Sequence, residues 1–265
     1  MRKRRFLMTI LAVAGLCLII VACYTNPQTG RKGLMLLSPQ EEAQLGFDAF
    51  RQIKSETAQS TDPAQIELVQ RVGQRIASQV HLPNAEWEFV AFKADDTPNA
   101  FCLPGGKVGI YTGILPLTQS EAGLAVVVSH EVAHAVARHG GERMSQSLVA
   151  ELGGVALSVA LRDKPEQTRQ LAMTAYGVGA TIGVMLPYSR KHELEADYMG
   201  LIYMAKAGYD PREAVAFWQR FKAWSDRRGG TPPEWLSTHP MDTRRIRELE
   251  NHLPEALAIF EGRRG

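Results

Sequence analysis

The run His130-Glu131-Val132-Ala133-His134 constrains this chain of 265 residues more than any other segment. Residues four apart on a helix lie on the same face, so the two histidines can offer ring nitrogens to one metal ion. Glu131 lies about 100° further around the helix, where its carboxylate can reach a water molecule beside the metal without binding the metal itself. The run therefore predicts half of a zinc site with a general base next to it.

The residues around this run indicate a long buried helix. Thr118 and Glu121 have the spacing of a capping box, which predicts that the helix begins there. The apolar residues 124–128 lead up to the first histidine, and Gly140-Gly141 predicts the end of the helix. The alternative is a buried helix that carries two histidines by chance.

Glu193 and Asp197 are the candidates to complete the site. They are four residues apart and therefore share one helix face. A catalytic zinc ion needs three protein ligands and an open fourth position, and we expect Glu193 to be the third ligand. Asp197 is expected to accept the N–H of a ligand histidine and fix its tautomer. Glu195 points elsewhere on the helical wheel and is expected to face solvent; for the whole segment, an ordinary charged helix face is the alternative.

These two helices give the sequence a family resemblance. It resembles the HtpX and CAAX-prenyl-protease family of zinc metallopeptidases, in which a His-Glu-x-x-His helix is followed by a Glu-x-x-x-Asp helix, the gluzincin arrangement. Three further segments carry the likeness, which is strongest for the small bacterial lipoproteins of the YcaL and LoiP type: residues 99–106, residues 237–240 and Arg245-Ile246. The resemblance implies an α+β fold, mainly helical, with a small sheet beside the His-Glu-x-x-His helix of a zincin-like metalloprotease domain.

The resemblance also implies roles for single residues. It assigns one zinc ion (Zn2+) per chain to His130, His134 and Glu193, and it makes Glu131 the catalytic acid and base. His239 is implied to face the cleft. There it can stabilise the developing oxyanion, or it can occupy the fourth zinc position and hold the enzyme latent.

Substrate binding is expected to use a strand, because an extended peptide can add to an exposed sheet edge. Asn99 and Ala100 resemble the family segment that lines the cleft. The glycines that follow, Gly105-Gly106, are better explained as a hairpin turn.

The function expected from these features is that of a zinc metalloendopeptidase of the bacterial cell envelope. Its substrates would be unfolded or misassembled envelope proteins, cleaved in quality control. The alternative is a zinc-bound chaperone or scaffold for envelope protein assembly, with weak or latent hydrolysis.

The composition is that of an ordinary globular chain, with 45% hydrophobic and 22% charged residues. We expect one metallopeptidase domain over residues 38–265. The formal net charge of +2 includes four basic residues of a leader; taking those 4 from 30 Lys+Arg leaves 26 against 28 Asp+Glu. A near-neutral domain predicts no nucleic-acid partner. Cys102 is the one cysteine expected in the domain, as a packed residue.

The first 22 residues are typical of a lipoprotein signal peptide. Four basic residues precede the apolar residues 6–22, and a small residue comes directly before Cys23. The resemblance to a lipobox implies lipidation of Cys23 and a membrane anchor of acyl chains. Tyr24 is not the aspartate of inner-membrane retention, which favours the outer membrane, facing the periplasm. The alternative is an uncleaved anchor, since 17 residues is the short end of what spans a bilayer.

The remaining elements follow from local patterns. Residues 23–37 are expected to form a tether, in which proline and glycine break any regular element between residues 26 and 37. The patterns predict helices from Ser38 to about residue 57, from Asp62 to about residue 80, and after Asp210, and strands at residues 87–91 and 107–112. Residues 148–187 predict a helical hairpin packed on the catalytic core, with membrane contact as an alternative.

Overall fold

The computed structural model describes residues 23–181, 186–228, 234–240 and 243–262. The predicted signal peptide, residues 1–22, lies outside the described residues. The chain divides into two compact units, Met1–Ser38 with Gly141–Met185 and Pro39–Gly140 with Leu186–Gly265.

The first unit contains a small hairpin where the sequence predicted an irregular tether. Strand β1 (Cys23–Thr25) pairs antiparallel with β2 (Lys32–Leu34). Pro27 and Gly30 lie in the turn between the strands, where Gly30 takes the left-handed φ of +70° that favours glycine, and Gly33 lies within β2. Beside the turn, Arg31 forms a 2.8 Å ion pair with Glu142, which is fully buried. The prediction of a segment without strands was therefore wrong.

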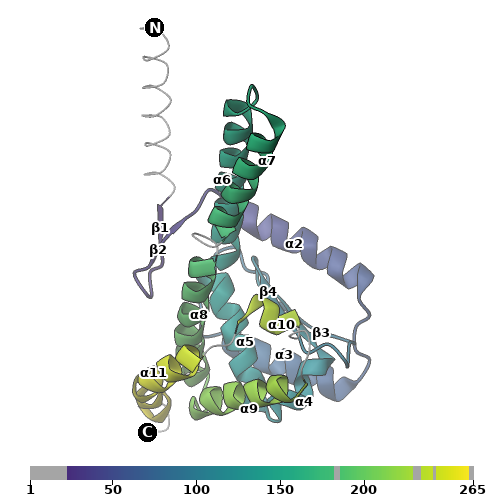
Figure 1. Ribbon diagram of the computed structural model, residues 1–265. Coiled ribbons are helices and arrows are strands. Elements are labelled where there is room, and N and C mark those ends of the chain that lie inside the picture. Colours follow the sequence, from purple (N-terminus) through teal and green to yellow (C-terminus); the bar gives the residue numbers. More distant parts are fainter. Residues whose placement is uncertain (1–22, 182–185, 229–233, 241–242, 263–265) are drawn as a thin grey trace. The chain divides into compact units, whose positions relative to one another are not determined.

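The same unit contains the predicted helical hairpin. Helix α6 (His139–Ala160) begins just before the unit and is followed by α7 (Glu166–Ala180), as the green part of Figure 1 shows. The Tyr176 hydroxyl donates a 2.8 Å hydrogen bond to the Ala150 carbonyl and joins the two helices. Among the described residues, none of the helices combines the length and apolar character that a membrane crossing needs.

The second unit is mainly helical with a small sheet, which confirms the predicted fold class. Its elements in chain order are α2 (Pro39–Glu56), α3 (Pro63–Ala77), β3 (Glu88–Phe92), β4 (Ala100–Leu103), β5 (Lys107–Tyr111), a 3-10 turn (Thr112–Ile114), α4 (Leu115–Thr118), α5 (Glu121–Val136), α8 (Leu186–Lys206), α9 (Arg212–Arg228), α10 (Glu234–Thr238) and α11 (Thr243–Gly262). The predicted helices and strands of residues 38–112 are present, with shifts of a few residues at their ends.

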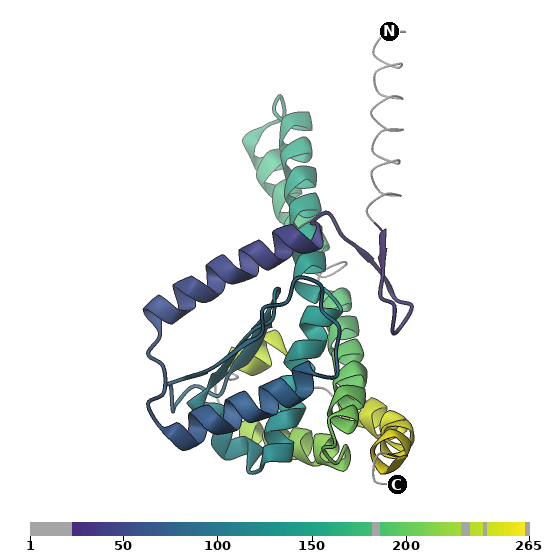
Figure 2. The same cartoon turned by 180° about the vertical axis from the view of Figure 1, so that it is seen from behind.

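The sheet has the order β3-β5-β4, so β4 lies at its edge. Strand β3 runs parallel to β5, whereas β4 runs antiparallel to it. Helix α3 packs along β3, helix α2 contacts β4 and β5, and helix α5 packs against β4 (Figures 1 and 2). This arrangement brings the edge strand beside the helix that carries the His-Glu-x-x-His run.

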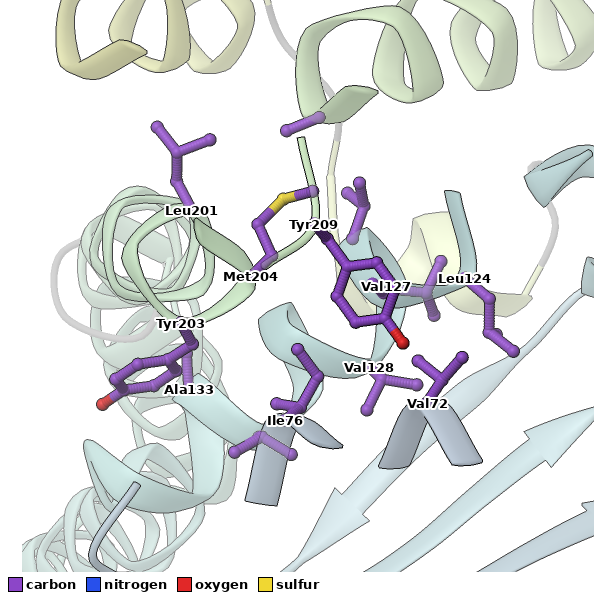
Figure 3. Packing of buried hydrophobic residues seen from close by; sticks show 14 of the residues in the cluster. Val72, Ile76, Leu124, Val127, Val128, Ala133, Leu201, Tyr203, Met204 and Tyr209 are labelled. Atoms are coloured by element: carbon purple, nitrogen blue, oxygen red, sulfur yellow. The ribbon is translucent and has the colours of Figure 1, made fainter. Parts of the chain in front are cut away.

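Helix α5 forms the centre of the core. It is apolar around most of its circumference, as expected of a helix buried on all sides, and it packs against α3, α8 and α9. Figure 3 shows Val127 and Val128 of this helix among side chains that include Ile76 of α3 and Met204 of α8. The close packing fixes the helix that supplies the metal-binding residues.

Both ends of α5 differ from the prediction. The N-cap is Ser120, whose hydroxyl accepts a hydrogen bond from the Gly123 N–H at 3.0 Å, whereas Thr118 ends the preceding helix α4. A Cβ on Gly123 would lie 2.0 Å from the Thr118 carbonyl oxygen, so this tight corner requires glycine. The sequence therefore predicted correctly that a hydroxyl side chain caps the helix, but it placed the cap at Thr118 instead of Ser120.

The C-terminus of α5 comes earlier than the predicted Gly140-Gly141. The helix ends at Val136, and the glycine pair lies inside α6. Arg138 adopts the left-handed conformation with φ 59°, and its guanidinium donates hydrogen bonds of 2.9 and 3.1 Å to the buried Glu42. A long-range ion pair therefore decides where the turn lies, in preference to the residue with the best local propensity.

Candidate metal centre

Three helices supply the candidate centre. Helix α5 carries His130, Glu131 and His134, helix α8 carries Glu193, and His239 directly follows the short helix α10. Gly200 lets α8 approach α5 closely, because a Cβ at this position would lie 3.0 Å from the backbone nitrogen of His130. The packing of α5 on α8 thus joins two segments that are about sixty residues apart in the sequence.

Four side chains converge on one point. The ligand atoms of His130, His134, Glu193 and His239 all lie within 4.8 Å of one another, and all four residues are buried. His130 Nε2 is 3.1 Å from His134 Nε2 and 3.3 Å from Glu193 Oε2. His239 Nδ1 is 3.3 Å from His130 Nε2 and 3.0 Å from Glu193 Oε2. The structure therefore brings together the three predicted ligands and adds His239 to them.

The donor set fits zinc. Imidazole nitrogens and carboxylate oxygens are ligands that zinc takes, and about 2.0–2.2 Å from a tetrahedral ion they would be about 3.3–3.6 Å apart. The contacts of 3.0 to 3.4 Å between these donors are close to that spacing, and all donor atoms lie within 4.8 Å of one another. Burial lowers the pKa of His134 well below its ordinary value, which leaves this ring neutral and able to donate a lone pair.

Asp197 lies behind His130, away from the converging donor atoms. Its Oδ1 is 3.0 Å from His130 Nδ1, the ring nitrogen that does not face the donors. Arg245 donates hydrogen bonds of 2.7 Å to both carboxylate oxygens of Asp197. Burial alone would raise the pKa of the Asp197 carboxyl, but the positive charge of Arg245 outweighs burial and lowers it. Burial also opposes the charge on His130, yet the hydrogen bonds with Asp197 and Glu193 raise its pKa to about 9.

Glu131 is buried and is not one of the four converging residues. Its Oε1 accepts a 2.8 Å hydrogen bond from the Trp235 indole N–H and lies 3.4 Å from His239 Nε2. Trp235 is completely buried and stacks on Trp218 with a centroid distance of 5.0 Å. A rigid aromatic cluster therefore fixes the carboxylate beside the metal centre.

The expectation that Glu195 faces solvent was wrong. Its side chain is 7% exposed, and Oε2 lies 2.8 Å from Nε2 of the fully buried His139. His139 Nδ1 in turn is 2.8 Å from His134 Nδ1. The helical wheel placed Glu195 correctly off the Glu193 face, but a second buried segment, the start of α6, covers that side of α8.

The two residues predicted to bind substrate lie on the edge strand. Ala100 begins β4, and its side chain is buried in the hydrophobic core, so only its backbone could contact a peptide. The Asn99 side-chain oxygen accepts a 2.9 Å hydrogen bond from the Ala100 N–H, and its carbonyl accepts one from Tyr111. Burial and the charge of Glu131 raise the pKa of the Cys102 thiol in β4, and β4 packs against α5, the helix that carries Glu131.

Sequence reasoning missed three residues of the centre: His139, Trp235 and the ion-pairing role of Arg245. Arg245 was noted only as part of a family motif. His139 carries a weak signal, a third histidine within ten residues of the first, whereas nothing local points to Trp235. Cys23, the predicted lipidation site, begins β1 with an exposed side chain, and its lipidation stays a prediction.

Comparison with known proteins identifies relatives of the chain. A model of Peptidase family M48 matches residues 63–253. The chain is 36% identical over 233 residues to the mitochondrial metalloendopeptidase OMA1 of Schizosaccharomyces pombe, which covers 87% of this chain and 66% of that protein. It is 31% identical over 248 residues to human mitochondrial metalloendopeptidase OMA1, covering 89% and 47%. It is 27% identical over 234 residues to the beta-barrel assembly-enhancing protease of Escherichia coli, covering 86% and 47%.

These relatives correct the predicted location of the protein and leave its predicted place within the family untested. The chain spans about two thirds of the fission yeast relative and about half of the other two. The predicted location at a bacterial outer membrane is wrong, because the relatives from fission yeast and human are mitochondrial enzymes. The narrower resemblance to the lipoprotein branch stays a prediction. Because the family model matches more than half of its residues, the chain belongs to peptidase family M48, a family of zinc metallopeptidases.

Proposed function

We propose that the chain is a zinc-dependent endopeptidase that hydrolyses peptide bonds of unfolded or misassembled proteins. The observation that carries this proposal is that α5 presents two metal-binding histidines and, separately from them, a carboxylate beside the metal centre. His130 and His134 converge with Glu193, whereas Glu131 lies beside these donors with its own hydrogen-bond partner. A purely structural zinc site needs no carboxylate in that position.

His130, His134 and Glu193 would hold the metal ion. When bound, zinc supplies a Lewis acid that polarises a carbonyl oxygen and activates water at neutral pH. Glu131 would take the proton from the attacking water and pass it to the leaving amine. The Trp235 N–H fixes Oε1 of this carboxylate, which leaves Oε2 to handle the proton. Asp197 and Arg245 hold His130 in the orientation that presents Nε2.

The substrate is proposed to bind along β4 in an extended conformation. This strand lies at the sheet edge, where backbone groups can pair with an added strand irrespective of side-chain sequence. Main-chain recognition suits unfolded proteins, because they expose extended backbone. Asn99, at the start of the strand, would contact the substrate near Glu131.

A second candidate function is a latent enzyme that also acts as an assembly factor. The observation in its favour is the position of His239, whose Nδ1 lies among the donor atoms. A fourth protein ligand is typical of a closed, structural zinc site and would displace the water that hydrolysis needs. The E. coli relative is named an assembly-enhancing protease, which is compatible with both activities in one chain.

The variant Glu131→Gln tests the endopeptidase. It keeps the size of the side chain and the acceptor for Trp235 but removes the base. We expect about one zinc per chain, as in the wild type, with cleavage of casein reduced by at least about 100-fold. Zinc content is measured by elemental mass spectrometry. Cleavage is measured by the release of soluble peptides from casein. Wild-type cleavage by this variant would rule out the proposed mechanism.

A further inference from the structure

A line of hydrogen bonds leads from the metal centre into the core on the side away from Glu131. His134 Nδ1 lies 2.8 Å from His139 Nδ1, and His139 Nε2 lies 2.8 Å from Glu195 Oε2. We call these three residues the histidine–glutamate relay. His139 is fully buried and the other two are nearly so. The ring of His192 stacks on that of His139 at 4.1 Å and 13°, which fixes the plane of the middle residue.

With Glu195 ionised and both rings neutral, each hydrogen bond of the relay has one direction. An ionised carboxylate only accepts hydrogen bonds, so Glu195 requires a proton on His139 Nε2. A neutral His139 then has a lone pair on Nδ1, which accepts from a proton on His134 Nδ1. A neutral His134 protonated at Nδ1 has its lone pair on Nε2. That atom lies 3.4 Å from Glu193 Oε1 and 3.1 Å from His130 Nε2, among the donors.

We infer that Glu195, acting through His139, fixes the tautomer and orientation in which His134 binds zinc. The inference rests on the proposed zinc-peptidase function and adds two positioning residues to it. His130 has a separate support, because Asp197 contacts its Nδ1 directly. Helix α8 therefore supplies a metal-facing carboxylate, Glu193, and two further carboxylates that each orient one ligand histidine.

Zinc affinity tests the relay without reference to proteolysis. His139→Leu removes the acceptor for His134 and should raise the zinc Kd by roughly 10–100-fold, measured by competition with a chromogenic chelator. His139→Gln should restore part of this loss, because its side-chain oxygen can accept the same hydrogen. Glu195→Gln keeps the shape of the side chain, but either its amide oxygen or its amide nitrogen can face His139. This variant should raise the zinc Kd by about 10-fold.

A matched control separates the relay from the general cost of removing a buried carboxylate. Glu142 is fully buried and paired with Arg31 in the other unit. Glu142→Gln should leave the zinc Kd unchanged. Circular dichroism and thermal unfolding establish that each variant is folded, and if His139→Leu fails to fold, Glu195→Gln decides the question. Wild-type zinc affinity in folded Glu195→Gln would overturn the inference, as would a His139→Gln that binds zinc no better than His139→Leu.

The relay and the proposed function fail in different ways. If Glu131→Gln cleaves like the wild type, the catalytic mechanism fails, whereas the zinc affinities of the relay variants are unaffected. If Glu195→Gln keeps its zinc affinity while Glu131→Gln is inactive, the peptidase mechanism stands and the relay is refuted.

Discussion

His130 and Glu131 are neighbours in the sequence, yet they belong to two different sets of contacts. His130 faces the donors and is held from behind by Asp197, whereas Glu131 is held by Trp235. A step of one residue, about 100° around α5, therefore separates the imidazole that would bind the metal from the carboxylate that would move a proton. At this scale the helical repeat predicted that the two side chains point in different directions, and the structure places them in different surroundings.

Removing the side chain of Glu193 and removing that of Asp197 should have different effects on zinc binding. Glu193→Ala deletes a donor atom and should abolish both zinc binding and cleavage. Asp197→Ala leaves every donor in place but frees Nδ1 of His130, and should raise the zinc Kd by roughly 10–100-fold. Both constants are measured by chelator competition. Equal effects of the two substitutions would contradict the division between ligand and orienting residue.

His239 gives opposite predictions for its two candidate roles. As an oxyanion stabiliser, His239→Ala would lower kcat by about 100-fold or more with little effect on KM. The contacts of Nδ1 favour the other role, a ligand that occupies the fourth position. We therefore expect His239→Ala to cleave casein faster than the wild type and to keep its zinc, as measured by kcat and metal content. A large loss of kcat would contradict the latch.

At the scale of helices, the metal centre depends on the close contact between α5 and α8. The interiors of both helices could be predicted from the sequence, because a continuous apolar run marks α5 and the four-residue spacing of the candidate ligands and their partners marks both helices. Their boundaries and packing could not. The end of α5 at Val136 depends on the Arg138–Glu42 ion pair, whose partners are 96 positions apart. The burial of Glu195 likewise depends on a segment far away in the sequence.

Gly200→Ala tests this helix contact. Alanine normally stabilises a helix over glycine by about 1 kcal/mol. Here the added Cβ would lie 3.0 Å from the backbone of His130, so we expect instead a loss of roughly 1–3 kcal/mol together with weaker zinc binding. Chemical denaturation and chelator competition measure the two effects. Gly177→Ala in α7, where a Cβ meets nothing within 4 Å, is the control and should be stabilising. A stabilised Gly200→Ala with unchanged zinc binding would contradict the packing argument.

At the scale of the whole molecule, the centre links the closely packed helices α5 and α8 of the second unit to the segment around α10. A ligand that binds only the folded state stabilises it, by about 4 kcal/mol when free zinc is about 1,000 times the Kd. For a chain of this size, each kcal/mol raises Tm by roughly 2–4 °C.

Zinc removal should therefore lower the stability of the chain. We expect a chelator to lower Tm by several degrees in the wild type and to have little effect on Glu193→Ala, which has no zinc to lose. Differential scanning calorimetry measures both. An unchanged wild-type Tm after verified loss of zinc would show that the metal is not coupled to folding.

Arg245 lies at the start of α11 and binds Asp197, Glu193 and the backbone carbonyls of His239 and Pro240. These contacts have a consequence for biosynthesis. A ribosome makes the two histidines more than a hundred residues before it makes Arg245. The nascent chain therefore cannot complete its hydrolytic centre until nearly the whole second unit has emerged.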